Sequence, residues 1–345
     1  MSRKPLVDVR DLSVAFPVYG GVLSRKVAEV IAVDHVSFSI GRREIVGLVG
    51  ESGCGKTTLG RAMINILKHT APDVEIGGEI IYHFDDVDVN FTELRARELR
   101  KYRSRVQMIF QDPYASLNPR MTVEQIVEEP LIIHTNLSAD QRQENVLSLL
   151  EKVGLREDHV ERYPHEFSGG QRQRVGIARA LATNPDLIIC DEPVSALDVS
   201  IQAQVINLMM DIQEEFDVSF LFIAHDLSVV EYISNKIAVM YLGNLVEFGK
   251  GQEVYHHPKH PYSNALISAV PIPDPEQKDR ERIVLKGDVP TPMNKPSGCS
   301  FRTRCPQAEP SCADHVPIFE THAPDHWVAC PIVKNKNNGV NNEIQ

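Results

Sequence analysis

The sequence GESGCGKT at residues 50–57 decides the fold class of this chain, and it follows the apolar run EIVGLV at residues 44–49. Its glycines let backbone amides curl around phosphate oxygens without obstruction by side chains. Lys56 is placed to reach the β- and γ-phosphates, and Thr57 to offer a hydroxyl to Mg²⁺. The helix expected from Thr57 to Leu67 points the positive end of its dipole at the anion. The stretch therefore predicts an ATP or GTP site.

Length and composition indicate an ordinary globular protein. The chain has 345 residues, of which 42% are hydrophobic and 24% charged, which suits one large domain or two smaller ones. Its formal net charge of -11 argues against general binding to nucleic acid or to an anionic lipid surface. No apolar run approaches the roughly 18 residues that span a bilayer, and the start MSRKPLVDVR lacks the apolar core of a secretory signal. We therefore expect a cytoplasmic location.

Short apolar runs alternate with helical stretches through the first part of the chain. Strands are expected at 45–49, 106–110, 187–190 and 220–224, and helices at 57–67 and 201–216. This alternation predicts an α/β fold with parallel strands covered by helices. Residues 116–165 break the rhythm, because they show helical periodicity and no clear strand, and so predict an inserted helical subdomain.

The composition of the sequence changes after Phe248. Frequent prolines between 258 and 296 exclude long helices and central strands and indicate a separate tail module. Residues 334–345 are polar and are expected to be disordered.

The run LIICDE at residues 187–192 is an apolar strand that ends in two carboxylates. In such a site the first acid, Asp191, holds Mg²⁺ and the second, Glu192, polarises water. Neighbouring strand residues point to opposite faces, so the two carboxylates can take different tasks.

The sequence FSGGQ at residues 167–171 precedes the helical run RQRVGIARALA. It offers a second glycine-rich helix N-terminus that is suited to phosphate. A single nucleotide held by the loop at 50–57 would leave this second terminus without a ligand. We therefore expect it to complete a site on another subunit, which makes dimerisation part of the predicted mechanism.

Taken together, GESGCGKT, FSGGQ, LIICDE, the run Ser195-Ala-Leu-Asp198 and His225 resemble, in order and spacing, the motifs of the ATP-binding cassette (ABC) ATPases. The resemblance covers residues 6–250, and Phe167 replaces the leucine that is usual in the signature. It implies a P-loop NTPase cassette that hydrolyses ATP to ADP and phosphate. It also implies a head-to-tail dimer with two ATP molecules between the subunits.

The resemblance further implies roles for individual residues. Lys56 neutralises phosphate charge, Glu192 is the general base and His225 contacts the γ-phosphate. Thr57 and Asp191 hold Mg²⁺, and Gln111 senses the metal and the water. Phe16 stacks on adenine, with Tyr19 as the alternative. The implied contacts to the chain's own nucleotide come from the phosphate loop: Gly50, Glu51, Ser52, Gly53, Cys54, Gly55, Lys56, Thr57 and Thr58. The implied contacts to a nucleotide held by the partner subunit come from the signature and the segment after Glu192: Ser168, Gly169, Gly170, Gln171 and Asp198.

Two segments outside the shared motifs look like the dipeptide and oligopeptide uptake subfamily of ABC importers: QDPYASLNPRMT at 111–122 and HPYSNALISAVP at 260–271. This resemblance implies a peripheral ATPase at the cytoplasmic face of the cell membrane. It would pair with a paralogous ATPase beneath two permeases that are fed by an external solute-binding protein. The chain is more similar to the second, F-type ATPase, which the long insert between Phe16 and Ala32 fits.

Other functions stay open at this point. Oligosaccharide and nickel importers use nearly the same ATPases, so the solute is implied only by the resemblance. A soluble cassette ATPase of translation or DNA repair would carry two cassettes or a long coiled coil, and neither is visible in the sequence.

The tail contains Cys299, Cys305, Cys312 and Cys330, separated by five, six and seventeen residues. Lasting disulfides are not expected in a reducing compartment, so the four thiolates suggest one metal site. The paired C-x-x-C of zinc ribbons is missing, and prolines follow two of the cysteines as in ferredoxins, so spacing leaves zinc and iron–sulfur open. The peptide-importer resemblance favours a [4Fe–4S] cluster in an extension at 251–333, with Zn²⁺ as the alternative.

Overall fold

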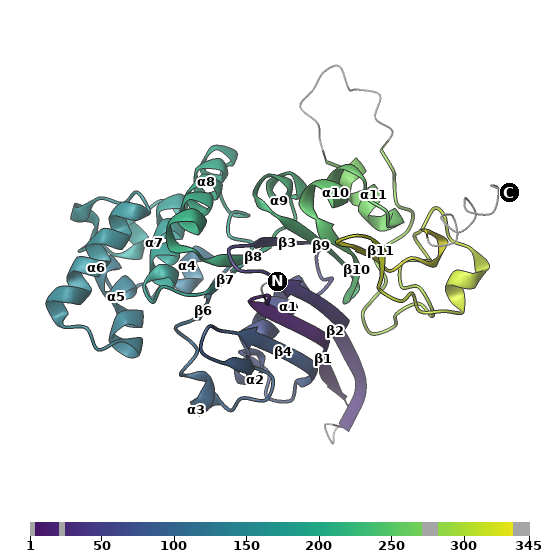
Figure 1. Ribbon diagram of the computed structural model, residues 1–345, viewed down its shortest axis with the longest axis horizontal. Helices are drawn as coiled ribbons and strands as arrows, with labels where there is room; N and C mark the ends of the chain where they lie inside the picture. Colours follow the sequence, from purple (N-terminus) through teal and green to yellow (C-terminus); the bar gives the residue numbers. More distant parts are fainter. Residues whose placement is uncertain (1–3, 21–24, 271–281, 334–345) are drawn as a thin grey trace, which may run out of the picture. The chain divides into compact units, whose positions relative to one another are not determined.

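The computed structural model describes residues 4–20, 25–270 and 282–333 (Figure 1), and the tail predicted to be disordered lies outside them. The chain forms two compact units. Of the described residues, the first comprises 4–6, 40–45 and 93–223, and the second comprises 7–20, 25–39, 46–92, 224–270 and 282–333. No helix within the described ranges is long and apolar enough to cross a bilayer.

The first unit contains three parallel strands in the order β8-β7-β6: β6 (Val106–Ile109), β7 (Leu187–Asp191) and β8 (Ser219–Ile223). Every residue of β7 and β8 is buried, as expected of parallel strands that are covered on both faces. The three strands lie where the apolar runs predicted them, with ends shifted by one residue at most.

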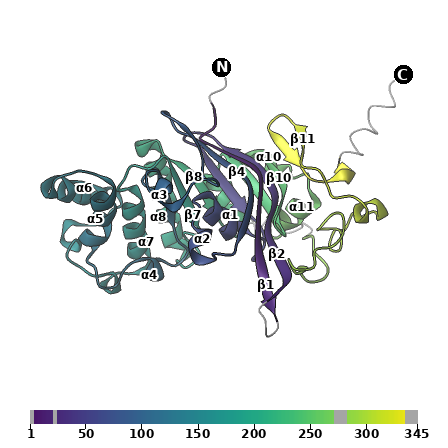
Figure 2. The ribbon, with the colours of Figure 1, turned by 90° about the horizontal axis from the view of Figure 1, so that it is seen from below.

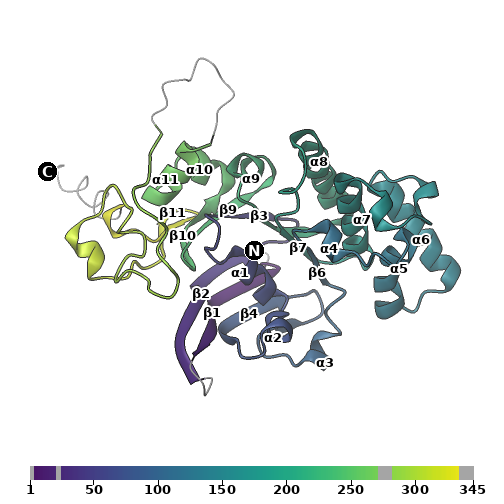
Figure 3. The same ribbon diagram turned by 180° about the vertical axis from the view of Figure 1, so that it is seen from behind.

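Helices occupy the chain between β6 and β7. α5 (Val123–His134) packs against both α6 (Ala139–Lys152) and α7 (Gly169–Leu181), as Figure 3 shows. Thr122 and Ser138 start α5 and α6, each in a reciprocal capping box with the glutamine three residues later. Residues 110–186 are all described and contain no strand, in agreement with the helical insert predicted from periodicity.

The other helical elements of the first unit are α8, which follows β7 and packs against α7, and four short turns. Their bounds are α8 (Val199–Phe216), α3 (Ala96–Leu99), α4 (Pro113–Ser116), η1 (Glu157–His159) and η2 (Pro164–Glu166).

The second unit contains an antiparallel sheet in the order β2-β1-β4-β5 that the sequence analysis did not predict. Its strands are β1 (Val7–Gly20), β2 (Arg25–Ile40), β4 (Glu75–His83) and β5 (Asp88–Asn90). β1 and β2 run side by side along their length (Figure 2). Many residues of β1, β2 and β4 are only partly buried, so these strands lack the continuous apolar runs that mark the parallel strands. The insert between Phe16 and Ala32 includes the end of β1 and the start of β2.

A second sheet of this unit has the order β11-β12-β10-β9-β3. The strand β3 (Ile45–Val49), which leads into the phosphate loop, is parallel to β9 (Lys236–Tyr241), and the remaining neighbours are antiparallel. The remaining strands are β10 (Asn244–Lys250), β11 (Glu320–Ala323) and β12 (His326–Val328). Two short strands from the cysteine-bearing tail thus extend the sheet that carries the phosphate loop.

The predicted helix at 57–67 is split in two. α1 (Lys56–Met63) stops two residues before Asn65, which has a left-handed φ of 49°, and α2 (Leu67–Thr70) follows. Such a conformation is a common way for a helix to stop. The Asn65 side chain also donates to the carbonyl oxygen of Phe91 at 2.6 Å, which fixes the break.

The carboxylate of Glu247 ties the tail to β10. Glu247 is fully buried and accepts hydrogen bonds from the N–H groups of Lys259 and His260, at 2.7 and 2.9 Å. Its Oε1 also lies 2.7 Å from Nε2 of His326 on β12. Three partners satisfy this carboxylate, which would otherwise be costly to bury. The remaining helical elements described in this unit are short: α9 (Leu227–Ile233), α10 (Gly251–His256), α11 (Pro261–Ser268) and η4 (Pro310–Ala313).

Candidate active site

The phosphate loop depends on glycines for two different reasons. Gly50, Gly53 and Gly55 have φ angles of 153°, 79° and 107°, which side chains rarely adopt. A Cβ on Gly50 would lie 2.2 Å from the carbonyl oxygen of Met240, and one on Gly55 would lie 2.1 Å from that of Ala32. No heavy atom lies within 4 Å of a Cβ built on Gly53. Positions 50 and 55 therefore need glycine for conformation and space, and position 53 for conformation alone.

Lys56 is the first residue of α1, and its side chain turns back over the loop. Its Nζ donates to the carbonyl oxygens of Gly50 and Glu51, at 2.8 and 3.1 Å. The side chain is buried. The ammonium group is thus held inside the curled backbone, where a phosphate oxygen would compete with these carbonyls for it.

Glu51 has two partners that the sequence analysis missed. Its N–H donates to the hydroxyl of Tyr262 at 2.9 Å, and its carboxylate forms an ion pair with Arg304 at 2.6 Å. The partners lie 211 and 253 residues further along the chain. No motif in the sequence links these positions, so only the fold could reveal the contacts.

In the first unit, Gln111, the predicted sensor of metal and water, lies beside Glu192, the predicted general base. Nε2 of Gln111 donates to Oε2 of Glu192 at 2.7 Å. The contact follows from the strand register, because β6 and β7 are parallel neighbours with Ile109 opposite Cys190. The chain therefore brings both residues to the same edge of the sheet.

Asp191 and Glu192 differ in environment, as their adjacent positions predicted. Asp191 is buried at the end of β7, whereas Glu192 is half-buried. Glu192 has a left-handed φ of 49°, and its N–H donates to the carbonyl oxygen of Ile223 at 3.0 Å. Its own carbonyl oxygen accepts from the hydroxyl of Ser195 at 3.0 Å. The backbone of the predicted base is thus fixed on both sides.

Asp198 is exposed at the start of α8. The segment before it is held by a residue that the sequence analysis missed, Gln202, whose Nε2 donates to the carbonyl oxygens of Val194 and Leu197 at 2.9 and 3.0 Å. The side chain therefore sets the course of the chain that leads from Glu192 to Asp198.

The signature FSGGQ forms the N-terminus of α7. Ser168 Oγ accepts from the N–H of Gln171, and Gln171 Oε1 accepts from the N–H of Ser168, at 3.4 and 3.0 Å. A Cβ on Gly170 would lie 2.5 Å from Cγ2 of Ile201 on α8, so the close packing of α7 and α8 requires glycine there. Phe167, the departure from leucine, is buried and packs edge-to-face on His159.

The remaining predicted nucleotide residues lie in the second unit. Cys54 is buried in the loop while Ser52 is exposed, and Thr57 and Thr58 are half-buried in the first turn of α1. His225 is exposed in the segment after β8. Phe16 and Tyr19 both lie on β1, and Tyr19 is the more exposed, at 50%.

The four tail cysteines are free thiols, with Cys299 and Cys312 buried. The N–H of Cys299 donates to the carbonyl oxygen of Cys312 at 2.8 Å. Burial, with a smaller effect of the neighbouring thiols, raises the pKa of Cys299 to about 11, and burial also raises the pKa of Cys305 and of Cys330. Across the described residues, no group of three or more histidine, cysteine or acidic side chains is arranged to hold a metal ion. The predicted cysteine site is thus not preformed.

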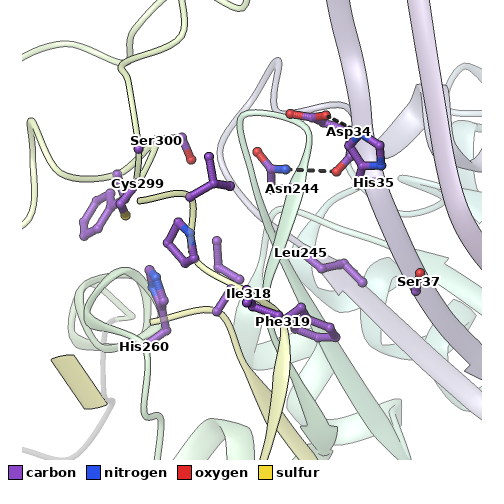
Figure 4. A pocket seen from close by; sticks show the side chains of 16 residues that line it. Asp34, His35, Ser37, Asn244, Leu245, His260, Cys299, Ser300, Ile318 and Phe319 are labelled. Atoms are coloured by element: carbon purple, nitrogen blue, oxygen red, sulfur yellow. Dashed lines mark hydrogen bonds and ion pairs between the residues drawn. The ribbon is translucent and has the colours of Figure 1, made fainter. Parts of the chain in front are cut away.

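A cavity of about 390 Å³ lies beside Cys299 (Figure 4). Strands β2 and β10 and residues 316–319 contribute to its lining, which is mostly apolar. Its buried histidine, His260, accepts a hydrogen bond from the N–H of Tyr262 at 3.1 Å. Burial lowers the pKa of His260 to about 4, so the ring is neutral at physiological pH.

Comparison with known proteins fits this geometry. The sequence profile described as ABC transporter matches residues 33–195. A second profile, described as the C-terminal region of oligopeptide/dipeptide transporters, matches residues 246–312. The solved ATP-binding cassette MJ0796, in a post-hydrolysis dimer bound to ADP and Pi, superposes with a TM-score of 0.59 at 27% identity, covering 71% of this chain and 98% of that one.

Relatives extend the likeness over almost the whole length. The oligopeptide transport ATP-binding protein AppF of Bacillus subtilis is 52% identical over 330 residues, which cover 95% of this chain and 98% of the relative. OppF of Salmonella typhimurium is 51% identical over 332 residues, with 95% and 96% covered. The chain therefore belongs to the ABC transporter ATP-binding proteins, in the branch whose members are named for oligopeptide transport.

Proposed function

We propose that the chain hydrolyses ATP to power the uptake of di- and oligopeptides as a subunit of an ABC importer. The phosphate loop, with Lys56 folded over it at 2.8 Å from the Gly50 carbonyl, is the observation that carries the ATPase assignment. The peptide assignment is supported by relatives named for peptide transport that match more than nine-tenths of the chain.

Within this function the predicted catalytic residues divide the work. Lys56 stabilises the negative charge of the phosphates, and His225 contacts the γ-phosphate. Glu192 accepts a proton from the attacking water, which Gln111 helps to orient through its 2.7 Å bond to the carboxylate.

Thr57 and Asp191 are the proposed Mg²⁺ ligands, with Gln111 as a third contact. The donor set fits, because hydroxyl, carboxylate and amide oxygens are the ligands that Mg²⁺ prefers. The burial of Asp191 favours a cation-binding role over a solvated surface charge. Held by these residues, Mg²⁺ would supply positive charge that stabilises the negative charge developing on the phosphates.

The signature and Asp198 are proposed to act across a dimer interface. The N–H groups at the start of α7 offer an anion site, and residues 168–171 together with Asp198 would contact ATP held by a partner subunit. We propose a paralogous ATPase as that partner. On the chain's own ATP, Phe16 or Tyr19 is proposed to stack on the adenine.

Residues 111–122 are the proposed docking segment for the two permease subunits. Tyr114 in this segment is 58% exposed, and the guanidinium of Arg172 on α7 lies 5.4 Å from its ring centre. Arg179, also on α7, donates to the carbonyl oxygen of Ser116 at 2.6 Å. Because both arginines follow the signature on one helix, a movement of α7 would be passed to the docking segment. We propose that the protein works at the cytoplasmic face of the membrane, bound to these permeases.

We also propose the domain limits 6–250 for the nucleotide-binding domain, with its helical subdomain at about 116–165, and 251–333 for the extension. The four tail cysteines are proposed to hold a [4Fe–4S] cluster. The backbone hydrogen bond of 2.8 Å from the N–H of Cys299 to the carbonyl oxygen of Cys312 supports a shared site, because it holds two of the four cysteines close together. Zn²⁺ is the alternative occupant, since four thiolates also satisfy a structural zinc ion.

The test is affinity purification of the tagged chain from detergent-solubilised native membranes, followed by mass spectrometry. Two permeases, a second cassette ATPase and a peptide-binding protein are expected. Recovery with a nickel- or sugar-binding protein would contradict the peptide assignment alone. Recovery only from the soluble fraction with ribosomal or DNA-repair proteins would contradict the transport assignment.

A further inference from the structure

Glu51 in the phosphate loop contacts two residues from the C-terminal part of the chain, Tyr262 and Arg304. Nη1 of Arg304 donates to its Oε2 at 2.6 Å and Nη2 donates to its Oε1 at 3.0 Å, which is the two-pronged geometry of a strong arginine–carboxylate pair. The Arg304 side chain is only 8% exposed and that of Glu51 27%. The pair is therefore shielded from water far better than a surface ion pair.

The backbone turn that carries Arg304 is held by a hydrogen bond and by aromatic packing. It ends a turn in which its N–H donates to the carbonyl oxygen of Phe301 at 3.0 Å. The Phe301 ring is buried and packs on Tyr241 and Tyr262, with ring centres 5.2 and 5.3 Å apart. Tyr262 in turn accepts the Glu51 N–H. One aromatic cluster thus supports both groups that hold Glu51.

The backbone of Glu51 also organises the inside of the loop. Its carbonyl oxygen accepts from Nζ of Lys56 at 3.1 Å and from the N–H of Cys54 at 3.3 Å. A shift of Glu51 would therefore move the lysine that meets the phosphates and the amides that line the loop.

We propose that Arg304 is a positioning residue of the ATPase reaction, which acts by holding Glu51 and with it the phosphate loop in the form that receives ATP. Tyr262 assists from the other side of the same residue. The C-terminal segment thus supports the nucleotide site through the contact between Arg304 and Glu51. This inference rests on ATP binding at the phosphate loop.

The simpler interpretation is that the ion pair only fastens the C-terminal segment to its unit. Loss of Arg304 would then lower the melting temperature and leave the ATP affinity of the folded protein unchanged. ATP affinity, measured well below the melting temperature, separates the two interpretations.

The experiment measures Mg·ATP binding by the purified full-length chain and its Arg304→Gln, Arg304→Lys, Glu51→Gln, Tyr262→Phe and double Glu51→Gln/Arg304→Gln variants. Arg302→Gln is the matched control, because this arginine lies in the same turn but donates to Ser297, at 2.8 and 3.2 Å. Circular dichroism verifies that each variant is folded at the temperature of the titration.

We expect the Kd for Mg·ATP to be about tenfold larger in Arg304→Gln and in Glu51→Gln, which corresponds to a loss of about 1.4 kcal/mol in binding free energy. Arg304→Lys should have an intermediate Kd, because lysine keeps the positive charge but cannot make two parallel hydrogen bonds to one carboxylate. Tyr262→Phe should bind Mg·ATP several-fold more weakly than the parent. The double variant should be no weaker than the weaker single variant, since one interaction has been removed twice. The control should match the parent.

The proposal is overturned if folded Arg304→Gln binds ATP with the parent's Kd, or if the two single effects add in full in the double variant. A parent chain that binds no Mg·ATP would contradict the ATP site itself, and would be recognised before any variant is compared.

Discussion

Glu192→Gln is the substitution that separates catalysis from binding at this site. Gln111 donates its hydrogen bond to Oε2 of Glu192, and a glutamine oxygen at position 192 can accept the same bond. The backbone contacts of residue 192 with Ile223 and Ser195 do not depend on its side chain. The change therefore removes the basic oxygen and little else, and we expect a change in unfolding free energy of at most about 0.5 kcal/mol.

The expected loss is in turnover. A general base contributes a factor on the order of 100 to 10,000, which corresponds to about 3–5 kcal/mol in the activation free energy. The ATP affinity should stay within about twofold of the parent value, because the phosphate loop is unchanged and the lost carboxylate acts only in the hydrolysis step. ATP should accordingly accumulate unhydrolysed in a closed dimer.

The assay is phosphate release by the assembled transporter, combined with Mg·ATP titration and size-exclusion chromatography of the chain with ATP. Glu144→Gln is the matched control, because Glu144 is exposed on α6 and has no proposed role. Parent-level turnover in Glu192→Gln would refute the assignment of the base. A large loss of ATP affinity in that variant would refute the division between binding and catalysis.

Further predictions concern the loop glycines, the tail cysteines and the effect of pH. Gly55→Ala combines backbone strain with a clash of the new Cβ at 2.1 Å from a carbonyl oxygen, whereas Gly53→Ala adds only strain of about 1–2 kcal/mol. Urea unfolding should therefore show a larger loss of unfolding free energy for Gly55→Ala than for Gly53→Ala. Equal losses in the two variants would contradict the account. Anaerobically purified protein should contain iron that Cys312→Ser lacks, and zinc in the parent would contradict the cluster. His260 has a pKa of about 4 in the folded chain and about 6.5 when unfolded, so the unfolded state binds more protons between these values and stability falls as pH falls through that window. From pH 7 to pH 5 the loss should be about 2 kcal/mol greater than in His260→Asn, and parallel losses in both would contradict the low pKa.

The parallel strands and their edge residues could be predicted from the sequence because they depend on local patterns. The runs that became β7 and β8 are apolar throughout and buried throughout. Once β6 and β7 are parallel neighbours, Gln111 and Glu192 must emerge at one edge, and their hydrogen bond follows.

The antiparallel sheet and the support of the phosphate loop depend on pairings that no local pattern reveals. Residues of β1 such as Tyr19 are exposed within a strand, so the alternation that marks a half-buried strand is weak. Glu51 and Arg304 are 253 residues apart, and the phosphate-loop motif around Glu51 does not indicate that Arg304 is its partner. The break at Asn65 was missed for a different reason, since helical periodicity continues across a residue whose φ is 49°.

The most direct test of the central claim is uptake of labelled oligopeptides by cells that lack this chain and are complemented with the parent or with Lys56→Ala. Lys56 is the buried cation of the phosphate loop, so the variant should bind ATP poorly and restore no uptake while its permease partners are still recovered with it. The account predicts peptide uptake with the parent alone. Uptake at the parent rate with Lys56→Ala, or no peptide uptake with the parent, would contradict it.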